Sequence, residues 1–540
     1  SWDSPWDMLA MSKYNTITSL TESPLQEGLI YAGTDDGLIQ ITEDGGTNWR
    51  RVEVGSLPDV PKTAFVNDIK ADLHDANTVY IALDNHKFGD LNPYLLKSTN
   101  RGKSWRSVKG NIPERTLVWR VVQDHVKSDL LFAGTEFGVY FTIDGGERWV
   151  KLTGDVPTIS FRDLVIQRRE NDLVGATFGR GFYVFDDYNV LRNVSEEQLE
   201  QEATLFPVRN AWWYIQGPVL GFSEKASQGA AYFTAKNPPF GAVFTYYLAE
   251  ALKSKKTIRE EKEKELIEQD KDVPFLGWDE MESERRQEDP VIWLTVKDTD
   301  GNVVRRIEGP TKKGFHRVAW DLRFPTTNAI DTKGDFDGGN QSGVMAAPGD
   351  YTVTLSKQID GTVTPLSDPI PFEVERMRKG ALDGSEAKDV AAFWQQLAKL
   401  QRSTTATSLV LRNTLTRVDA MRVALSRTPA APGDLDKQLY ELRQTLLALD
   451  EQINGNRSKR QVGEIGTPTI GSRLRFAMGG TRLSTYGPTP NLQRSLEIAY
   501  SQFAEVQRTL DSILKQQLPD MERALSEAGA PWVEGQPIPK

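Results

Sequence analysis

The chain has no cysteine in 540 residues and only four histidines. The missing cysteines exclude disulfides, thiolate metal sites and cysteine nucleophiles together. The histidines lie too far apart in the sequence to indicate a histidine-rich metal centre; they are His74, His86, His125 and His316. Chemistry based on a thiolate or on a histidine-bound metal is therefore not expected.

The chain also lacks long apolar runs and a positive net charge. No run of ~18 apolar residues could span a bilayer, and the segment from Ser1 does not have the pattern of a signal peptide. A net charge of -10 gives no general attraction to nucleic acid or to anionic membranes. Because the sequence begins at Ser1 without a methionine, we expect a processed protein or a fragment.

The length is too great for one hydrophobic core. We expect four β-propeller blades in 1–192 and an immunoglobulin-like β-sandwich in 193–380, with a charged helical insert at 250–289. A helical bundle in 381–540 follows, with a long basic loop at 457–488. The predicted fold class is therefore mainly β in the N-terminal two-thirds, followed by an all-α bundle.

Three octapeptides share the spacing Ser/Thr-x-Asp/Asn-x-Gly-x-x-Trp, at 42–49, 98–105 and 142–149. Their tandem arrangement, in a repeat of about 50 residues, indicates a propeller-type array. The acid or amide can accept hydrogen bonds across the turn, and the tryptophan packs between sheets. We interpret this box as structural, through Asp44, Trp49, Asn100, Trp105, Asp144 and Trp149.

The fourth repeat, ATFGRGFYVFDD at 176–187, lacks the box and resembles a terminal blade. Closed propellers have ~4 to 8 blades, so four blades are the lower limit. We therefore expect the blades to pack against blades from another polypeptide or from a missing N-terminal half.

These boxes, the AGT-x-x-G turns and the segment 176–187 resemble bacterial Asp-box proteins with neuraminidase-type (BNR) repeats and a sortilin-like propeller, which carry the name glycosyl hydrolase. The chain is similar to the C-terminal half of those proteins. The resemblance implies a bacterial, extracytoplasmic protein (periplasmic, cell-surface or secreted). Most members have no assigned substrate, so the family name implies little about enzymology.

The second part contains short strands with a tight Asp300-Gly301 hairpin, a spacing that indicates a β-sandwich. The expected strands are 242–248, 291–298, 302–309, 314–322 and 349–357. They resemble the immunoglobulin-like domain beside the core of the flagellar hook-cap protein, which positions other domains. The insert 250–289 is either an exposed helical excursion or a partner-docking arm, the latter supported by Phe275, Leu276 and Trp278.

No cofactor is expected, although one loop offers oxygen ligands for calcium. Its acids are Asp331, Asp335 and Asp337, followed by Asn340, but the EF-hand spacing is not met. A flexible polar loop is the alternative.

From Asp383 the apolar period becomes helical. We predict helices at 385–426, at 434–454 and from 489 to about 529, which together form an antiparallel three-helix bundle. The intervening basic loop would be disordered, wrap the neighbouring domain, or bind an acidic partner.

The early strand of each repeat is expected to be innermost, so equivalent residues would face a central channel. These are Thr16, Asp68, Arg120 and Asp163. Asp68 and Asp163 are the candidate catalytic carboxylates of a glycosidase. Candidate ligand-binding residues are Asn67, Arg120, Arg162 and Trp119, while Trp212 and Trp213 are further candidates for stacking on sugars. The alternative is a set of internal ion pairs that holds the blades in register.

Two functions follow. The first is an exported binding or scaffolding component that engages a protein partner, a second copy or a carbohydrate. The second is a glycoside hydrolase acting at the propeller channel.

Overall fold

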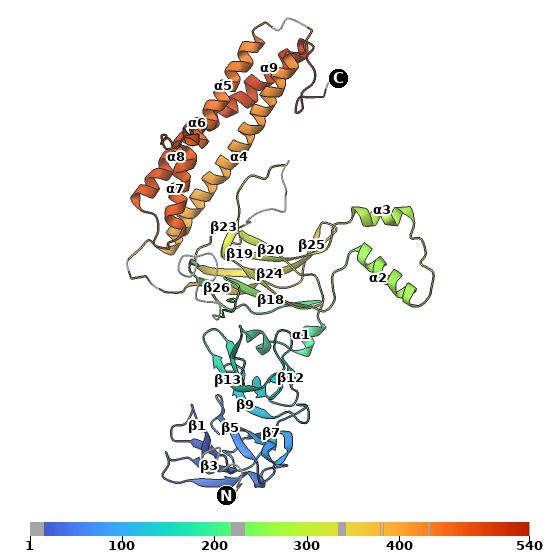
Figure 1. Cartoon of the computed structure of the whole chain (residues 1–540), viewed down its shortest axis with the longest axis vertical. Coiled ribbons are helices and arrows are strands. Elements are labelled where there is room, and N and C mark those ends of the chain that lie inside the picture. Colours follow the sequence, from blue (N-terminus) through green and yellow to red (C-terminus); the bar gives the residue numbers. More distant parts are fainter. Residues whose placement is uncertain are drawn as a thin grey trace. The chain divides into compact units, whose positions relative to one another are not determined.

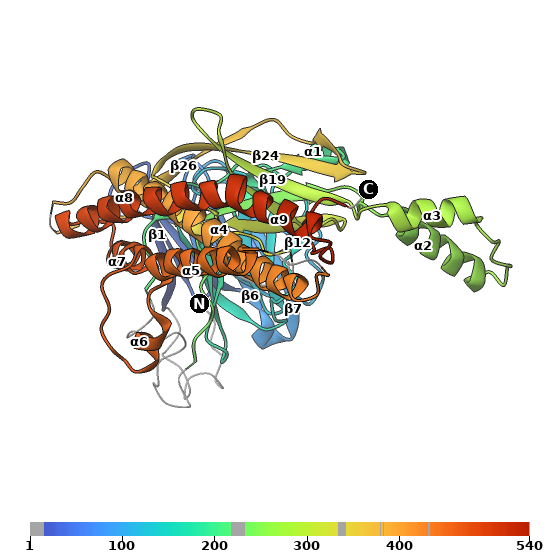
Figure 2. The same ribbon diagram turned by 90° about the horizontal axis from the view of Figure 1, so that it is seen from above.

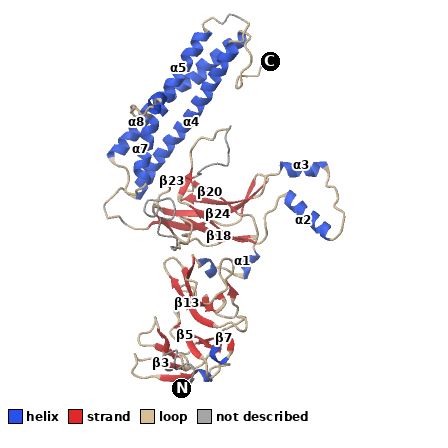
Figure 3. Ribbon diagram, viewed as in Figure 1, coloured by secondary structure: helices blue, strands red, loops and turns tan. Residues whose placement is uncertain are grey.

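The computed structural model describes residues 16–217, 233–332, 342–378, 380–381, 383–429 and 433–538. The chain forms two compact units, Ser1–Gln198 and Leu199–Lys540 (Figure 1). Strands dominate the first two-thirds, and helices dominate from α4 (Ala387–Leu425) onward (Figure 3). The predicted fold class is confirmed at this level.

The first unit contains four antiparallel sheets formed in sequence order, called blades 1 to 4 here. Blade 1 holds β1 (Ile17–Glu22), β2 (Ile30–Thr34), β3 (Leu38–Thr42) and β4 (Arg50–Glu53). Blade 2 holds β5 (Phe65–Ala71), β6 (Val79–Asn85), β7 (Asp90–Ser98) and β8 (Arg106–Ser107). Blade 3 holds β9 (Val118–Gln123), β10 (Leu131–Thr135), β11 (Gly138–Thr142) and β12 (Val150–Lys151). Blade 4 has three strands, β13 (Phe161–Gln167), β14 (Asp172–Thr177) and β15 (Phe182–Phe185).

Consecutive blades pack through their first strands, because β1 contacts β5, β5 contacts β9 and β9 contacts β13. Every residue of β6 is buried, as expected for a strand covered on both faces. The sheets approach closely at Gly134, where an added Cβ would lie 2.9 Å from the carbonyl oxygen of Phe161. A glycine is therefore needed where blade 3 meets blade 4.

The three boxes close turns on the blades. Asp44 Oδ1 accepts from the Asn48 N–H at 2.9 Å, and this bond lowers the pKa of Asp44. Asn100 Oδ1 accepts from the Ser104 N–H at 2.8 Å, and Asp144 Oδ1 from the Arg148 N–H at 3.1 Å. The tryptophans differ from one another in burial.

Trp149 is buried and Trp105 is partly buried against the core shared by blades 1 and 2. Trp49 is exposed, so its predicted packing between sheets is wrong. Its indole N–H donates to the carbonyl of Gly46 inside its own turn, at 3.0 Å. This local bond satisfies the polar end of the ring without a neighbouring sheet.

The second unit begins with a β-sandwich. One sheet has the order β17-β26-β24-β19-β20, with β25 paired to β24, and a second has the order β16-β18-β21. The first sheet comprises β17 (Ala211–Trp213), β19 (Val291–Asp298), β20 (Val303–Gly309), β24 (Gly349–Ile359), β25 (Thr362–Pro365) and β26 (Ile370–Arg376). The second comprises β16 (Ala203–Leu205), β18 (Ala242–Leu248) and β21 (Gly314–Trp320), and a short pair is formed by β22 (Arg323–Pro325) and β23 (Ser342–Met345).

The charged insert forms two helices, α2 (Lys255–Glu268) and α3 (Trp278–Arg286), which project from the sandwich in Figures 1 and 2. Ser254 caps α2 by accepting from the Thr257 N–H. The short helix α1 (Glu196–Glu200) precedes β16 in the sequence. None of the helices in the described ranges is long and apolar enough to cross a membrane.

The helical end contains more than the three predicted helices. Its elements are α4, α5 (Leu435–Asn454), α6 (Arg457–Gln461), α7 (Ile470–Arg482), α8 (Pro490–Ser512), a π-helical turn (Ile513–Gln517) and α9 (Leu518–Glu527). The prediction of a loop throughout 457–488 is therefore wrong, because α7 lies within it. Thr469 and Ser472 form a capping box that starts α7.

Glycines in α7 have a packing role that masks its helical pattern. A Cβ at Gly480 would lie 2.6 Å from the Leu492 side chain of α8, and a Cβ at Gly471 would lie 2.8 Å from the Ile453 carbonyl of α5. The missing side chains let α7 approach both helices closely. Leu474 and Ala477 then complete the buried face.

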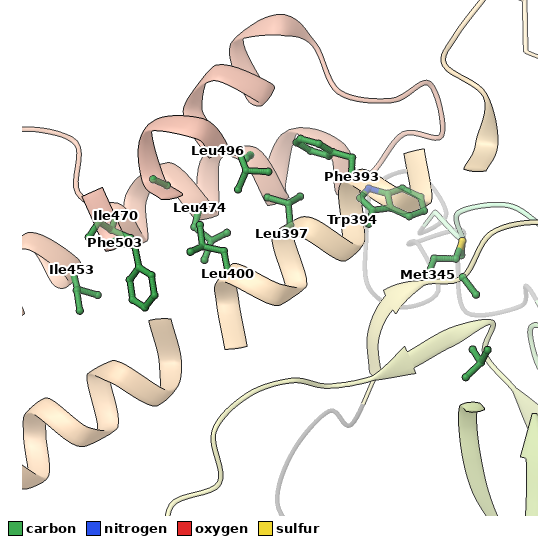
Figure 4. Packing of buried hydrophobic residues seen from close by; sticks show 14 of the residues in the cluster. Met345, Phe393, Trp394, Leu397, Leu400, Ile453, Ile470, Leu474, Leu496 and Phe503 are labelled. Atoms are coloured by element: carbon green, nitrogen blue, oxygen red, sulfur yellow. The ribbon is translucent and has the colours of Figure 1, made fainter. Parts of the chain in front are cut away.

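One core extends from the sandwich into the helices of the second unit. Trp394, near the start of α4, lies with its ring 6.1 Å from the ring of Trp213 on β17. Figure 4 shows Trp394 beside Met345 of β23, with Leu397 and Leu400 continuing along α4. The first turns of α4 thus anchor the helices to the sandwich.

Candidate functional site

The inner strands share one irregularity that fixes the candidate site. Each has a register shift in its pairing with the second strand of the blade, which inserts an extra residue. The residues just after the shift are equivalent and are Ser19, Asp68, Arg120 and Asp163, paired with Gly33, Ala82, Gly134 and Ala176. The assignment of Thr16 as the blade 1 equivalent is therefore wrong, because Ser19 holds that position.

The inserted residues are Thr18, Asn67, Trp119 and Arg162, three of which are candidate ligand-binding residues. They connect each blade to the next. Thr18 Oγ1 donates to the Val66 carbonyl at 2.6 Å, and Asn67 Nδ2 donates to the Val118 carbonyl at 3.1 Å. At the third junction the Arg162 guanidinium lies 3.6 Å from the centre of the Trp119 ring.

The residues after the shift form a second series of bonds. Ser19 Oγ accepts from the Ile69 N–H at 2.9 Å, and Asp68 Oδ2 accepts from the Val121 N–H at 3.1 Å. Arg120 has no acceptor to offer. At the third junction the Leu164 N–H therefore donates to Asp163 Oδ1 of its own strand, at 2.9 Å.

Arg120 connects the two candidate catalytic acids. Its Nη1 lies 3.1 Å from Asp68 Oδ1, and its Nε lies 3.1 Å from Asp163 Oδ1. The Asp68 side chain is 0% exposed, whereas that of Asp163 is 61% exposed. Burial raises the pKa of Asp68, although Lys70 and Arg120 both favour its charged form.

This geometry favours internal ion pairing at Asp68 over catalysis. A glycosidase needs both carboxyl groups to reach the same glycosidic bond. Asp68 is sealed from solvent, and both of its oxygens are engaged by Ser19, Arg120 and Val121. Of the two acids, only Asp163 is accessible to a ligand.

Two of the three tryptophans proposed for sugar stacking are occupied by protein contacts. Trp119 is buried, donates its indole N–H to Glu136 Oε2 at 2.9 Å and carries Arg162 on its ring. Trp213 is also buried, and its N–H donates to the Ala346 carbonyl at 2.8 Å. Neither ring offers a free face, so stacking of a sugar on Trp119 or Trp213 is not supported.

The inner strands instead border a cleft of about 290 Å³, to which all four contribute. Its charged residues are Glu22, Lys70 and Arg168, and apolar residues such as Val122 and Ile166 complete the wall. Sequence equivalence does not point to these residues, because they lie beyond the four equivalent positions of the inner strands. Their recurrence toward the C-terminal ends of the inner strands is the signal that could have identified them.

A second missed feature is a buried ion pair at the end of blade 3. Asp124 Oδ1 accepts from Arg192 Nη2 at 2.7 Å and from the Tyr188 hydroxyl at 2.9 Å. Burial raises the pKa of Asp124, but Arg192 and the N–H groups of Val126 and Lys127 outweigh it, so the pKa is lowered. The pair holds the segment after β15 against blade 3.

This lowered pKa predicts a specific acid sensitivity. A carboxyl with a depressed folded-state pKa contributes stability above its unfolded value of 3.8 and loses it as the pH falls through the folded value. Below about pH 3.8 the wild type should therefore lose unfolding free energy more steeply than an Asp124→Asn variant. Urea unfolding between pH 7 and pH 3 checks this expectation, and parallel pH profiles for the two proteins would contradict it.

The calcium hypothesis gains no support from the described part of the loop. Asp331 pairs with Arg412, whose Nη2 lies 2.7 Å from Asp331 Oδ2. Asp335, Asp337 and Asn340 lie outside the described residues. Within the ranges that the structure describes, no group of three or more histidine or acidic side chains is arranged to hold a metal ion.

No family model matches the chain, and no curated protein matches it. Solved structures do. YCF48 bound to D1 peptide matches with 18% identity over 32% of this chain and 52% of its own, at a TM-score of 0.25. The Cps50 (Swd1) β-propeller domain from Myceliophteria thermophila matches with 15% identity over 36% and 63%, at a TM-score of 0.26. The GH74 xyloglucanase from Xanthomonas campestris matches with 14% identity over 70% and 47%, at a TM-score of 0.26.

The chain thus spans about half the length of the first of these structures. At these identities and TM-scores the matches carry no argument about this chain.

Proposed function

We propose that this chain is a binding or scaffolding component of a larger extracytoplasmic assembly, and that its blades pack against further blades. The observation that carries the proposal is the apolar surface left exposed at both ends of the blade series. On blade 4, Val165, Phe182 and Val184 are exposed across β13 and β15. On blade 1, Ile17 and Leu20 are exposed along β1.

These surfaces differ from the corresponding surfaces inside the series. Inside the series, Val66, Ile69 and Val121 are the equivalents of Ile17 and Leu20, and the neighbouring sheet buries them. Leu95 and Val139, the equivalents of Phe182, are buried in the same way. Burial of apolar area is worth roughly 25 cal/mol per Å², so an uncovered blade face is a strong driving force for association. A further sheet is the partner whose shape matches such a face.

The projecting helices α2 and α3 give the second unit an additional surface for a partner. Phe275 and Trp278 are exposed there, with their rings 5.1 Å apart. Ion pairs on the arm, including Arg259 with Glu284 at 2.9 Å, hold the two helices together. This arm therefore supports a scaffolding role.

A glycoside hydrolase acting at the inner-strand face is the second candidate. The cleft bordered by all four inner strands and the exposed carboxylate of Asp163 favour it. The burial of Asp68 counts against it. An active enzyme would need its second carboxyl group from elsewhere.

If the protein is a scaffolding component, it should be purified from its native source in complex with another polypeptide chain. Formation of that complex should require the blade 4 face. Phe182→Asp should reduce recovery of that complex at least tenfold, because a charge would enter an apolar interface. Phe137→Asp, at an exposed site in the turn before β11, is the matched control and should leave recovery unchanged. Affinity purification with intact-mass measurement reads out both variants.

Two outcomes oppose the proposal. Equal recovery of the complex with both variants would remove the blade 4 face from the interaction. A free monomer that hydrolyses glycans, with activity lost in Asp163→Ala, would favour the hydrolase instead.

A further inference from the structure

We propose that the partner at the open blade faces is a second copy of this chain. Blade 4 of each copy packs on blade 1 of the other, so that two units of four blades close one ring of eight. Rings of this size fall within the range of ~4 to 8 blades that propellers adopt. This inference rests on the proposed function and names the partner.

The first step is the bond that each blade makes to the next. At the first two junctions, a polar side chain after the register shift accepts the N–H of the residue one position further along the next inner strand. These bonds join Ser19 to Ile69 and Asp68 to Val121. Blade 4 carries Asp163 at this position, and both of its described contacts use Oδ1. Its other carboxylate oxygen can accept an N–H from a following blade.

The second step is that blade 1 offers the matching donor. Ser23, Asp72 and Asp124 occupy equivalent positions, and the N–H of each donates to the carbonyl of the residue just before the second strand of its own blade. Since N–H directions alternate along a strand, the residue three positions before each of these points its N–H to the opposite side, away from its own blade's second strand. This residue is Ile69 in blade 2 and Val121 in blade 3, and in both cases a side chain of the preceding blade accepts its N–H. In blade 1 it is Leu20.

The inserted residues supply a second matching pair. Thr18 and Asn67 donate to the carbonyl groups of Val66 and Val118, which lie just before the register shift of the following blade. The corresponding carbonyl of blade 1 belongs to Ile17. In blade 4 the donor position is held by Arg162, whose guanidinium stacks on the Trp119 ring. A stacked guanidinium keeps N–H groups free at its edge, and these can donate to the Ile17 carbonyl of the second copy.

The apolar surfaces agree with this pairing. The exposed Val165, Phe182 and Val184 of blade 4 would face the exposed Ile17 and Leu20 of blade 1. A second copy brings both the acceptor on blade 4 and the donor on blade 1, and closure by a two-fold axis covers both ends at once. A single unrelated sheet would cover one end only, and a set of blades from another polypeptide, which could cover both, is the alternative that the experiments below distinguish.

Analytical ultracentrifugation of the full chain tests the proposal. The expected species is a dimer of the 60.5 kDa chain that dissociates on dilution. Val165→Glu should weaken self-association at least tenfold, because the charge is placed in the interface. Val126→Glu is the matched control, because Val126 is 60% exposed and Val165 is 59% exposed. Val126 lies in the turn between β9 and β10, away from both end faces.

Cross-linking tests the orientation. Because the natural chain has no cysteine, Leu20→Cys and Asp163→Cys can be placed singly in two copies with different tags. A bis-maleimide should link the first variant to the second and should form far fewer links between two copies of either variant. Circular dichroism establishes that both variants fold.

A chain that stays monomeric at all concentrations, or links that form equally in all combinations, would overturn the second-copy proposal. If a monomeric chain still loses its native complex through Phe182→Asp, only the identity of the partner is wrong and the scaffolding function stands. If neither a dimer nor a native complex is found, both proposals fail.

Discussion

Replacing Asp68 with alanine is expected to lower the free energy of unfolding of the blade unit by about 3 to 5 kcal/mol, as for other buried ion pairs that lose one partner. The substitution leaves the exposed Asp163 as the one carboxylate paired with Arg120 among the described contacts, beside the Asn67 carbonyl that accepts from Arg120 Nη1. It also removes the acceptor for the Val121 N–H, which is buried between blades 2 and 3. The penalty is therefore the cost of unpaired polar groups as well as that of a lost ion pair.

Asp163→Ala is the matched control, because Asp163 pairs with the same guanidinium from an exposed position. Its expected cost is about 0 to 1 kcal/mol, the usual range for surface pairs. Hydrogen exchange of the inner-strand amides, followed in urea, measures the first unit separately from the second. If Asp68→Ala costs no more than Asp163→Ala, the junction does not depend on Asp68. If Asp68→Ala abolishes a hydrolytic activity without loss of stability, Asp68 is catalytic after all.

The sequence predicts the blade strands well because the signal is local and repeated. The uninterrupted apolar and small residues of β2 and β10, followed by a third strand that ends in a box, give these blades their order. The inner-strand register is harder to predict, because blade 1 has the neutral Ser19 where the other blades have charged residues. With no charge to mark the equivalent position, Thr16 is chosen instead, three residues too early.

The helices show the same division between local and tertiary signals. The strict apolar spacing of α5 and α8 identifies both from sequence alone. In α7, glycine lowers helix propensity by about 1 kcal/mol per residue relative to alanine, so the segment resembles a loop. Its helix is favoured by the close approach of Gly471 and Gly480 to neighbouring helices, which no single sequence displays.

The candidate site is predictable only in part for a similar reason. Sequence equivalence brought Asp68, Arg120 and Asp163 together, and the structure places them in contact. The sequence pattern does not show that the Asp68 side chain is buried and that of Asp163 exposed. The pairing of Asp124 with Arg192 joins residues that are far apart in the chain, so it depends on how the last segment returns to blade 3.

Replacing Trp394 with alanine is expected to destabilise the second unit by about 3 to 5 kcal/mol, the usual cost of truncating a buried tryptophan. The ring fills the junction between the sandwich and α4, where it packs against Trp213. Because one hydrophobic core extends through this junction, the loss should lower the stability of both the sandwich and the helices. Urea unfolding followed by circular dichroism at helical and strand wavelengths measures both.

Trp278→Ala is the control, since this tryptophan lies exposed on the projecting arm and should change stability by less than about 0.5 kcal/mol. If the sandwich and the helices share one cooperative core, Trp394→Ala should shift both unfolding curves together. A shift of the helical curve alone would mean that the contact between Trp394 and Trp213 joins two independently stable parts. The position of α4 on the sandwich would then depend on weaker contacts, such as the 3.1 Å hydrogen bond from the Thr327 hydroxyl to the Ala398 carbonyl.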